Sequence, residues 1–277
     1  MLSLPHAVET RQPRTDVLGS GGIMEIATQL AELSVNDGTR MRCYAARPAQ
    51  EGHYPGLIVN QEAFGVNAHM RDVTERFARQ GYVAIAPELY HRTAEPGFEG
   101  RYDDFPALAP HFRGLTNEGL ASDVTAAHDW LRANGVHAPA PIATVGFCMG
   151  GRVAFLAATV LPLACAISFY GGGIAPGPHG PGLLDRVSRI HSPLLLFWGG
   201  RDKHIGPEQV RAVADALRAA EKDFVNVEFS DADHAFFCDA RPSYHAVAAA
   251  EAWALTLAFL HSHTTARSSQ GTAPGAA

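Results

Sequence analysis

Short apolar runs alternate with amphipathic helical segments along most of the chain. Apolar runs of strand length occupy residues 57–59, 82–86, 142–147, 164–169, 194–198 and 224–229. Helical patterns occupy residues 67–80, 117–134, 151–160, 207–220 and 244–261. Strands that are apolar throughout are buried on both faces, as in parallel sheets covered by helices. The alternation therefore predicts one α/β domain with a mostly parallel central sheet and helices on both faces.

The ends of the chain follow other patterns. Residues 31–35 and 41–45 flank Asn-Asp-Gly at 36–38, which predicts a β-hairpin. Residues 1–25 contain Pro and Gly without periodicity and predict a flexible N-terminal arm. Residues 264–277 are rich in Ser, Gly and Ala and predict a disordered tail. The domain is therefore expected to span residues 26–263.

Composition excludes several classes of protein. With 277 residues, 47% of them hydrophobic and 18% charged, the chain can bury a large core. Its net charge of -6 argues against a nucleic-acid binder. It contains no apolar run of about 18 residues, so no membrane span is expected, and no secretory signal. Four cysteines without CxxC spacing predict a reduced, cytoplasmic protein without a structural metal.

The most specific motif is GFCMGG at residues 146–151, between an apolar run and a helical segment. This is the pattern of a nucleophile elbow, with Cys148 in the central position. Gly146 and Gly150 let neighbouring backbone approach closely. The N-terminus of the helix that follows directs N–H groups at a thiolate. The motif predicts a nucleophilic Cys148 in a strained turn; a buried structural cysteine in a glycine turn is the alternative.

An acid and a histidine follow in the order that such a site requires. Asp202 comes shortly after the run 194–198, and His234 comes after the run 224–229. The carboxyl ends of parallel strands lie at one edge of the sheet, where sites collect. We expect Cys148 to attack an ester carbonyl, His234 to transfer protons and Asp202 to orient the imidazole. Asp231 and Asp233 remain alternatives to Asp202.

The loop after the run 57–59 is expected to complete the site. It reads NQEAFG at residues 60–65. In this position a loop normally donates an oxyanion-hole N–H, which we assign to Ala63, with the N–H of Met149 as the other donor. Glu62 is predicted to hold the proton of Cys148 and to release the thiolate when substrate arrives. An exposed loop carboxylate is the alternative for Glu62.

The chain resembles the dienelactone hydrolase (carboxymethylenebutenolidase) family from about residue 32 to 261. The segments that carry the resemblance are 61–65 (QEAFG), 87–90 (PELY), 146–152 (GFCMGGR), 169–171 (FYG), 199–202 (GGRD) and 234–236 (HAF). The resemblance implies an α/β-hydrolase fold, a triad of Cys148, His234 and Asp202, and a gating role for Glu62. It also implies hydrolysis of a lactone or ester without a cofactor.

The resemblance also suggests how substrate is bound. It implies that Arg92, after the PELY segment, grips the carboxylate of the substrate, which a guanidinium suits well. The family has a second substrate arginine where this chain has Cys238, and the nearest arginine is Arg241. We therefore expect Arg92, Tyr170 and Arg241 in the substrate site. The aromatic-rich stretch 88–115 is either a lid or an ordinary surface excursion.

Two classes of function remain open at this stage. The first is a hydrolase that acts on a small-molecule ester or lactone through an acyl-enzyme, including a thiol carboxylesterase of broader specificity. The second is a non-catalytic α/β-hydrolase scaffold that binds a small hydrophobic ligand. The ordered set of Cys148, Asp202 and His234 favours the hydrolase, because a binding module does not need it. We expect a monomer or a weak homo-oligomer.

Overall fold

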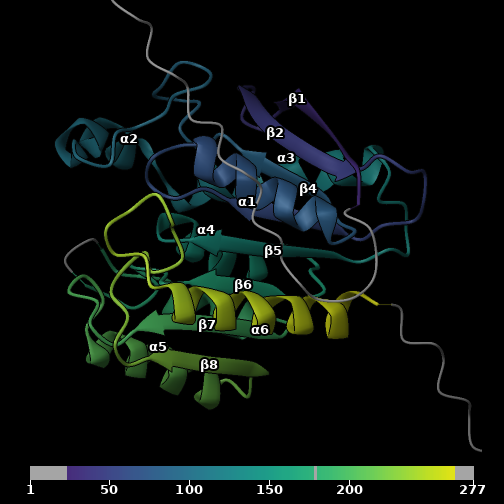
Figure 1. The fold of residues 1–277 in the computed structure, drawn as a ribbon. Helices are drawn as coiled ribbons and strands as arrows, with labels where there is room; N and C mark the ends of the chain where they lie inside the picture. Colours follow the sequence, from purple (N-terminus) through teal and green to yellow (C-terminus); the bar gives the residue numbers. More distant parts are fainter. Residues whose placement is uncertain (1–23, 178–179, 266–277) are drawn as a thin grey trace, which may run out of the picture.

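The computed structural model describes residues 24–177 and 180–265 (Figure 1). The strands are β1 (Ile26–Ser34), β2 (Arg40–Pro48), β3 (Gly56–Asn60), β4 (Val83–Pro87), β5 (Ile142–Phe147), β6 (Ala166–Phe169), β7 (Leu194–Gly199) and β8 (Phe224–Phe229). The α-helices are α1 (Ala68–Arg79), α2 (Ala109–Gly114), α3 (Asn117–Ala133), α4 (Met149–Ala158), α5 (Pro207–Ala219) and α6 (Ala246–Thr264). Two short 3₁₀ helices are η1 (Phe105–Leu108) and η2 (Leu184–Arg189).

The described strands form one eight-stranded sheet in the order β1-β2-β4-β3-β5-β6-β7-β8. The first two pairings, β1 with β2 and β2 with β4, are antiparallel, and all the others are parallel. The predicted α/β architecture with a mostly parallel sheet is confirmed. The hairpin is present, but β1 begins at Ile26 rather than near residue 31. Its first half is largely exposed, so no apolar pattern marks it, and pairing with β2 defines it.

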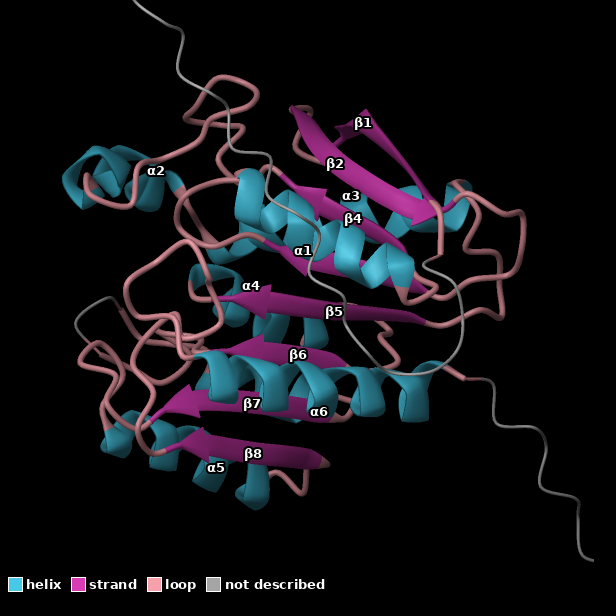
Figure 2. Cartoon of the chain, in the orientation of Figure 1, coloured by secondary structure: helices cyan, strands magenta, loops and turns pink. Residues whose placement is uncertain are grey.

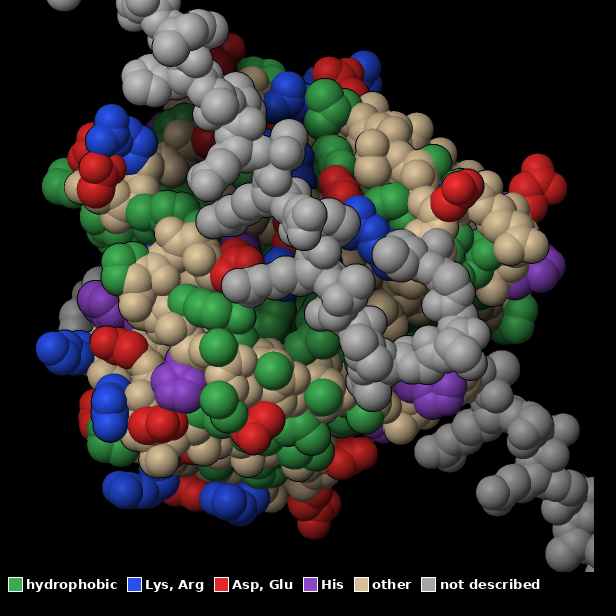
Figure 3. All heavy atoms as spheres, viewed as in Figure 1, with side chains coloured by type: hydrophobic (Ala, Val, Ile, Leu, Met, Phe, Trp, Pro, Cys, Tyr) green, Lys and Arg blue, Asp and Glu red, His purple; other side chains and the backbone are tan. Residues whose placement is uncertain are grey.

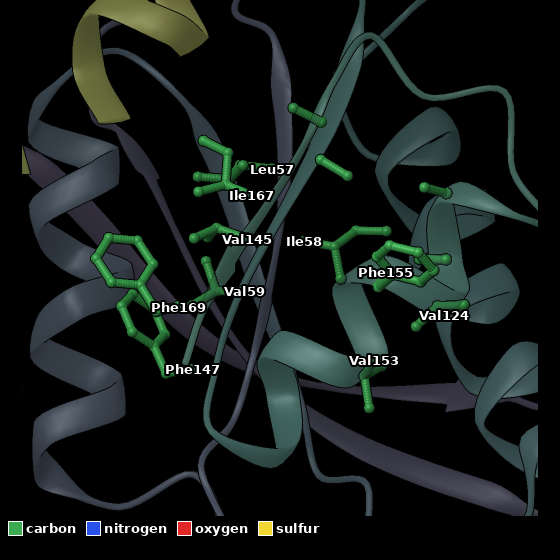
Figure 4. Packing of buried hydrophobic residues seen from close by; sticks show 14 of the residues in the cluster. Leu57, Ile58, Val59, Val124, Val145, Phe147, Val153, Phe155, Ile167 and Phe169 are labelled. Atoms are coloured by element: carbon green, nitrogen blue, oxygen red, sulfur yellow. The ribbon is translucent and has the colours of Figure 1, made fainter. Parts of the chain in front are cut away.

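Helices cover both faces of the sheet (Figure 2). Helices α1 and α6 lie on one face, and α3, α4 and α5 lie on the other. The side chains of β3 alternate between these layers, because successive residues of a strand point to opposite faces. Figure 4 shows Leu57 and Val59 on one side and Ile58, with Phe155 of α4, on the other. All five residues of β3 are buried, which explains its continuous apolar run.

The carboxyl ends of the parallel strands lie at one edge of the sheet (Figure 2). The loops after β3, β5, β7 and β8 therefore gather there. Helix α4 begins at Met149, directly after Cys148 and two residues earlier than predicted. Helix α6 runs to Thr264, so that residue belongs to the helix and not to a tail. The rest of the predicted tail, from 266, and residues 1–23 of the predicted arm lie outside the described residues.

The stretch 88–115 packs against the loop that follows β3. It contains η1 and α2. The ring centroid of Tyr102, in this stretch, lies 4.6 Å from that of Phe64, in the loop after β3. Phe105 and Phe112 stack on each other at 5.8 Å. Buried Phe64, Ala63 and Leu108 form a small second core beneath these rings. The stretch is therefore an ordered wall beside the loop that carries Glu62.

The surface carries mixed charge. On the face shown in Figure 3, basic and acidic side chains are interspersed around the described surface. No helix within 24–177 or 180–265 is both long enough and apolar enough to cross a bilayer.

Candidate active site

The backbone at Cys148 makes a sharp turn between β5 and α4. Its φ of 55° and ψ of -118° place it in a conformation that non-glycine residues rarely adopt. A Cβ at Gly146 would overlap the carbonyl of Gly150, and a Cβ at Gly150 would overlap the carbonyl of Asn60. The two glycines are therefore required by close backbone contacts. The N–H of Cys148 donates to the carbonyl of Phe169 at 3.0 Å, which ties the turn to β6.

The structure brings the three predicted triad residues into one hydrogen-bonded chain. Nε2 of His234 lies 3.1 Å from Sγ of Cys148, and Nδ1 of His234 lies 2.7 Å from Oδ2 of Asp202. The other carboxylate oxygen of Asp202 accepts the N–H groups of His204 at 2.7 Å and Ile205 at 3.1 Å. The carboxylate is thereby held in one orientation. The order nucleophile, imidazole, carboxylate is the one that nucleophilic catalysis requires.

Neither alternative acid reaches the imidazole of His234. Oδ2 of Asp231 lies 3.1 Å from Nε2 of His245, at the start of α6. Oδ1 of Asp233 accepts the backbone N–H of His234 at 2.7 Å. These contacts make Asp233 a turn-forming residue and Asp231 a partner of α6. Asp202 is the carboxylate in contact with the ring.

The charges of the triad stabilise one another. Burial by itself would lower the pKa of His234, but the negative charge of Cys148 and the hydrogen bonds to Asp202 and Cys148 raise it overall. Burial would raise the pKa of Asp202, but its hydrogen bond to His234 and the charge of that ring lower it. The contacts with Asp202 and Cys148 therefore favour a protonated His234 whenever Cys148 carries a negative charge.

The two predicted oxyanion donors lie on the loop after β3 and at the start of α4. Among the described residues, no hydrogen-bond acceptor is found for the N–H of Ala63 or of Met149. The hydroxyl of Tyr90 contacts both residues: it lies 3.0 Å from the carbonyl of Ala63 and 3.4 Å from Sδ of Met149. Tyr90 therefore joins the loop to the elbow. The close approach at Gly150 brings the same two segments together.

Glu62 is fully buried, so the interpretation as an exposed loop carboxylate is wrong. Its Oε1 accepts a hydrogen bond from the hydroxyl of Tyr170 at 3.4 Å, and its Oε2 has no partner among the described residues. No hydrogen bond joins Glu62 to Cys148 among the described residues, and the sulfur of Cys148 contacts His234 instead. The ring of Tyr170 lies 5.1 Å from that of His234, between centroids. Tyr170 thus stands between Glu62 and the triad.

The guanidinium of Arg92 forms salt bridges with two carboxylates of the chain itself. Its Nη1 and Nη2 donate to the two oxygens of Asp123 at 2.9 and 2.8 Å, and its Nε donates to Asp37 at 2.8 Å. Asp123 is fully buried in α3, and Asp37 lies in the turn of the β1–β2 hairpin. The substrate-binding role predicted for Arg92 is therefore corrected to a structural one, because its donors are already used.

Arg241 is differently placed. Its guanidinium lies over the rings of Phe64 and Tyr102, at 5.4 and 5.8 Å from their centroids. It makes no salt bridge within the part of the chain that the structure describes. Its positive charge acts on the buried hydroxyl of Tyr170, where it opposes the rise in pKa caused by burial and Glu62. Arg241 is therefore a cation near Tyr170 whose guanidinium N–H groups form no salt bridge with the described residues.

The structure also pairs His69 with Asp239, two residues that the sequence analysis did not single out. His69 lies in the first turn of α1, with Nδ1 3.4 Å from Oδ1 of Asp239. Fully buried Cys238 precedes Asp239, and its sulfur lies 3.6 Å from the hydroxyl of Tyr102. The positions of the two residues are a signal for this pair, because His69 closely follows the loop of Glu62 and Asp239 closely follows His234. The helical pattern of 67–80 drew no attention to His69, because it explains His69 as an ordinary helix residue.

Residues 24–177 and 180–265 contain no group of three or more His, Cys, Asp or Glu side chains arranged to hold a metal.

The order of the site along the sheet defines the class of protein. The nucleophile position follows β5, the carboxylate follows β7 and the histidine follows β8, as in α/β-hydrolases. A sequence model of the dienelactone hydrolase family matches residues 41–264, and the chain belongs to that family.

Relatives of similar length support this assignment. A protein of Synechocystis sp. named "Putative carboxymethylenebutenolidase" is 38% identical over 83% of this chain and 94% of its own length. One of Escherichia coli with the same name is 38% identical over 79% of this chain and 81% of its own. A crystal structure named as a putative dienelactone hydrolase from Klebsiella pneumoniae superimposes with a TM-score of 0.77 at 33% identity, covering 85% of this chain and 98% of that one.

The contacts of the three aspartates generate a test. Asp202→Asn is expected to lower kcat by about 10⁴-fold, because an amide favours the wrong tautomer of the histidine. It should also lower the pKa of His234, because a hydrogen bond and a negative charge that raise it are lost. Turnover of a p-nitrophenyl ester and an NMR titration of His234 measure the two effects. Asp231→Asn and Asp233→Asn are the controls, and a larger loss in either than in Asp202→Asn would contradict the assignment.

Proposed function

We propose that the protein hydrolyses small esters or lactones through a Cys148 acyl-enzyme, without a cofactor. The observation that carries this proposal is the continuous chain of contacts from Asp202 through His234 to Cys148, with the cysteine at the N-terminus of α4. The family and the names of its relatives support hydrolysis of this bond type. A non-catalytic scaffold would not require these contacts.

The arrangement suggests two chemical steps. In the first, His234 takes the proton of the Cys148 thiol, the thiolate attacks the carbonyl carbon, and the tetrahedral intermediate collapses as His234 gives that proton to the departing alkoxide oxygen. In the second, His234 takes a proton from water, which attacks the thioester and releases the carboxylic acid and the thiol. With a lactone the leaving alcohol stays attached, so the product is a hydroxy acid. The N–H groups of Ala63 and Met149 stabilise the negative oxygen in both steps.

We assign the recognition of an anionic substrate group to Arg241. Its stacking on Phe64 and Tyr102 leaves the N–H donors of the guanidinium available in its plane. Tyr170, whose ring lies beside His234, forms another part of the pocket wall. The side chains of the stretch 98–112 shape the same wall through Tyr102 and Phe105.

Removal of the thiol tests the proposal directly. Cys148→Ala is expected to reduce hydrolysis of a short-chain p-nitrophenyl ester by about 10⁴-fold or more, because the attacking group is gone. Cys165→Ala is the matched control: Cys165 is fully buried, and burial raises the pKa of its thiol to about 12. That variant should keep its turnover even if it loses stability. Near-normal turnover by pure Cys148→Ala protein would refute the proposal.

The two arginines provide a second test. Arg241→Ala is expected to raise KM about tenfold for a carboxylated ester and little for a neutral one of similar size, because only the first loses a charge-assisted pair. Arg92→Ala should affect both substrates alike and lower the free energy of unfolding by about 3–5 kcal/mol, because buried Asp123 loses its partner. Steady-state kinetics and urea denaturation measure these effects. Selectivity that depends on Arg92 rather than Arg241 would reverse the assignment.

Glu62 is proposed to keep the thiol of the resting enzyme protonated until substrate enters. A carboxylate near Cys148 disfavours the thiolate electrostatically. Glu62→Gln should therefore lower hydrolysis but make Cys148 react faster with iodoacetamide at neutral pH, with the alkylation profile moved to lower pH. Gln keeps the size of the side chain and can still accept the Tyr170 hydrogen bond. An unchanged alkylation profile together with unchanged turnover would remove Glu62 from the mechanism.

A further inference from the structure

Two chain segments meet where the parallel strands β3 and β4 end. The strands are neighbours in the sheet, so the loop that follows β3 and the turn that follows β4 start from the same edge. The loop carries Ala63, one of the two proposed oxyanion donors, and the turn carries Leu89 and Tyr90. Hydrogen bonds between the two segments therefore determine how the N–H of Ala63 is held.

The hydroxyl of Tyr90 holds the carbonyl of Ala63. It donates to that oxygen at 3.0 Å, and no other donor to this carbonyl is found among the described residues. Ala63 is fully buried and Tyr90 is only 3% exposed, so the bond is shielded from water. Because a buried carbonyl without a donor is costly, this bond favours one orientation of Ala63.

A second contact holds the peptide group on the other side of Ala63. Nε2 of Gln61 donates to the carbonyl of Glu62 at 3.3 Å, and Oε1 of Gln61 accepts the backbone N–H of Leu89 at 3.0 Å. The carbonyl of Glu62 and the N–H of Ala63 belong to one planar peptide group, so the position of the first restricts the direction of the second. Both peptide groups that flank Ala63 are thus tied to the turn at 89–90.

The same hydroxyl also contacts the elbow. It lies 3.4 Å from Sδ of Met149, whose backbone N–H is the other proposed oxyanion donor. A hydroxyl has one proton to donate, and the carbonyl of Ala63 is a stronger acceptor than a thioether, so the sulfur is a packing contact. Tyr90 therefore touches both segments that carry the proposed donors.

The ring of Tyr90 is itself held in place. Its centroid lies 6.0 Å from that of Phe98, 5.3 Å from that of His111 and 6.1 Å from that of Phe112. Because the phenol oxygen lies in the plane of the ring, a fixed ring fixes the hydroxyl. Burial, and after it the negative charge of Cys148, raise the pKa of Tyr90, so the hydroxyl stays protonated and able to donate at neutral pH.

We propose that Tyr90 and Gln61 are positioning residues that fix Ala63 against the elbow and thereby direct its N–H toward the oxyanion formed at Cys148. They act through the peptide groups of Ala63 and not on the reacting atoms. Donors held in advance lower the barrier, because they do not have to reorient when the negative oxygen forms. This inference rests on the proposed function and on the oxyanion role of Ala63.

Tyr90→Phe is the test, because it removes one hydroxyl and keeps the ring. For a short-chain p-nitrophenyl ester, kcat and kcat/KM should fall together by about tenfold while KM changes by less than about twofold, because the lost interaction acts on the transition state. Alkylation of Cys148 by iodoacetamide should keep its rate, since displacement at a saturated carbon creates no oxyanion. A residue that only supported the fold would not separate the two reactions.

An aldehyde inhibitor gives an independent measurement. The thiolate of Cys148 adds to the carbonyl carbon of the aldehyde, the π bond breaks, and the carbonyl oxygen takes the negative charge. The inhibition constant should rise in Tyr90→Phe by about the factor by which kcat/KM falls, because the adduct and the transition state share this oxyanion. An inhibition constant equal to that of the wild type would contradict the proposal.

Tyr82→Phe is the matched control. Tyr82 precedes β4, at the opposite end of the strand from Tyr90, and its buried hydroxyl lies 3.1 Å from Oγ1 of Thr264. This variant also loses a buried hydroxyl contact, so urea denaturation should show a loss of stability while the kinetics stay unchanged.

Gln61→Met removes the second tie and keeps the length of the side chain. It should lower kcat and kcat/KM in the same way as Tyr90→Phe and leave the alkylation of Cys148 unchanged. It carries the test if Tyr90→Phe does not fold.

Each remaining outcome has a definite meaning. Normal hydrolysis by folded Tyr90→Phe, or by Gln61→Met in its place, would overturn the inference. So would an equal loss of hydrolysis and alkylation, which would place the defect at the thiol, or an equal kinetic loss in Tyr82→Phe. Activity in Cys148→Ala would instead refute the proposed function. An inactive Cys148→Ala combined with unchanged kinetics of Tyr90→Phe would refute the positioning role alone.

Discussion

The turn at Cys148 holds the site together, and it exists because two glycines let three stretches of backbone meet. At Gly146 and Gly150 the space for a Cβ is taken by carbonyl groups of Gly150 and of the β3 loop. A backbone strained in this way costs about 1–3 kcal/mol, which the surrounding packing must offset. The buried α4, lying against β5 and β6, provides that packing. The same close approach, with Tyr90 in contact with both Ala63 and Met149, joins the loop after β3 to the elbow. The geometry of Cys148 and of the proposed oxyanion donors therefore depends on one turn.

Near this turn, titratable side chains form two sets of contacts. One runs from Asp202 through His234 to Cys148, and the other pairs His69 with Asp239. Tyr170 lies between the triad and Glu62, with its ring beside His234 and its hydroxyl donating to Glu62. Charges in a low-dielectric site act strongly on one another. The proposed control of Cys148 by Glu62 would therefore act through the field of a buried carboxylate and not through a hydrogen bond.

The regular part of the fold could be predicted from local patterns, and the exceptions have clear causes. The buried parallel strands are continuous apolar runs, so their positions could be read directly. The start of β1 could not, because its residues are exposed and it exists through pairing with β2. Helix α4 begins earlier than periodicity suggested, since Met149 and Gly150 are buried by the close approach of the β3 loop rather than by an amphipathic pattern.

The sequence by itself determined the elbow, the order of nucleophile, acid and histidine, and the strand ends at which they lie. These are local features, because a glycine-framed turn and the alternation of strands and helices depend on neighbouring residues. Only the tertiary structure decided which charges meet. Asp37 and Asp123 come to Arg92 from a hairpin and a distant helix and take up the donors expected to bind substrate. Asp239 pairs with His69 although the two residues lie 170 positions apart in the sequence. Pairs of this kind depend on how the chain folds in space, and the spacing of residues in the sequence does not predict them.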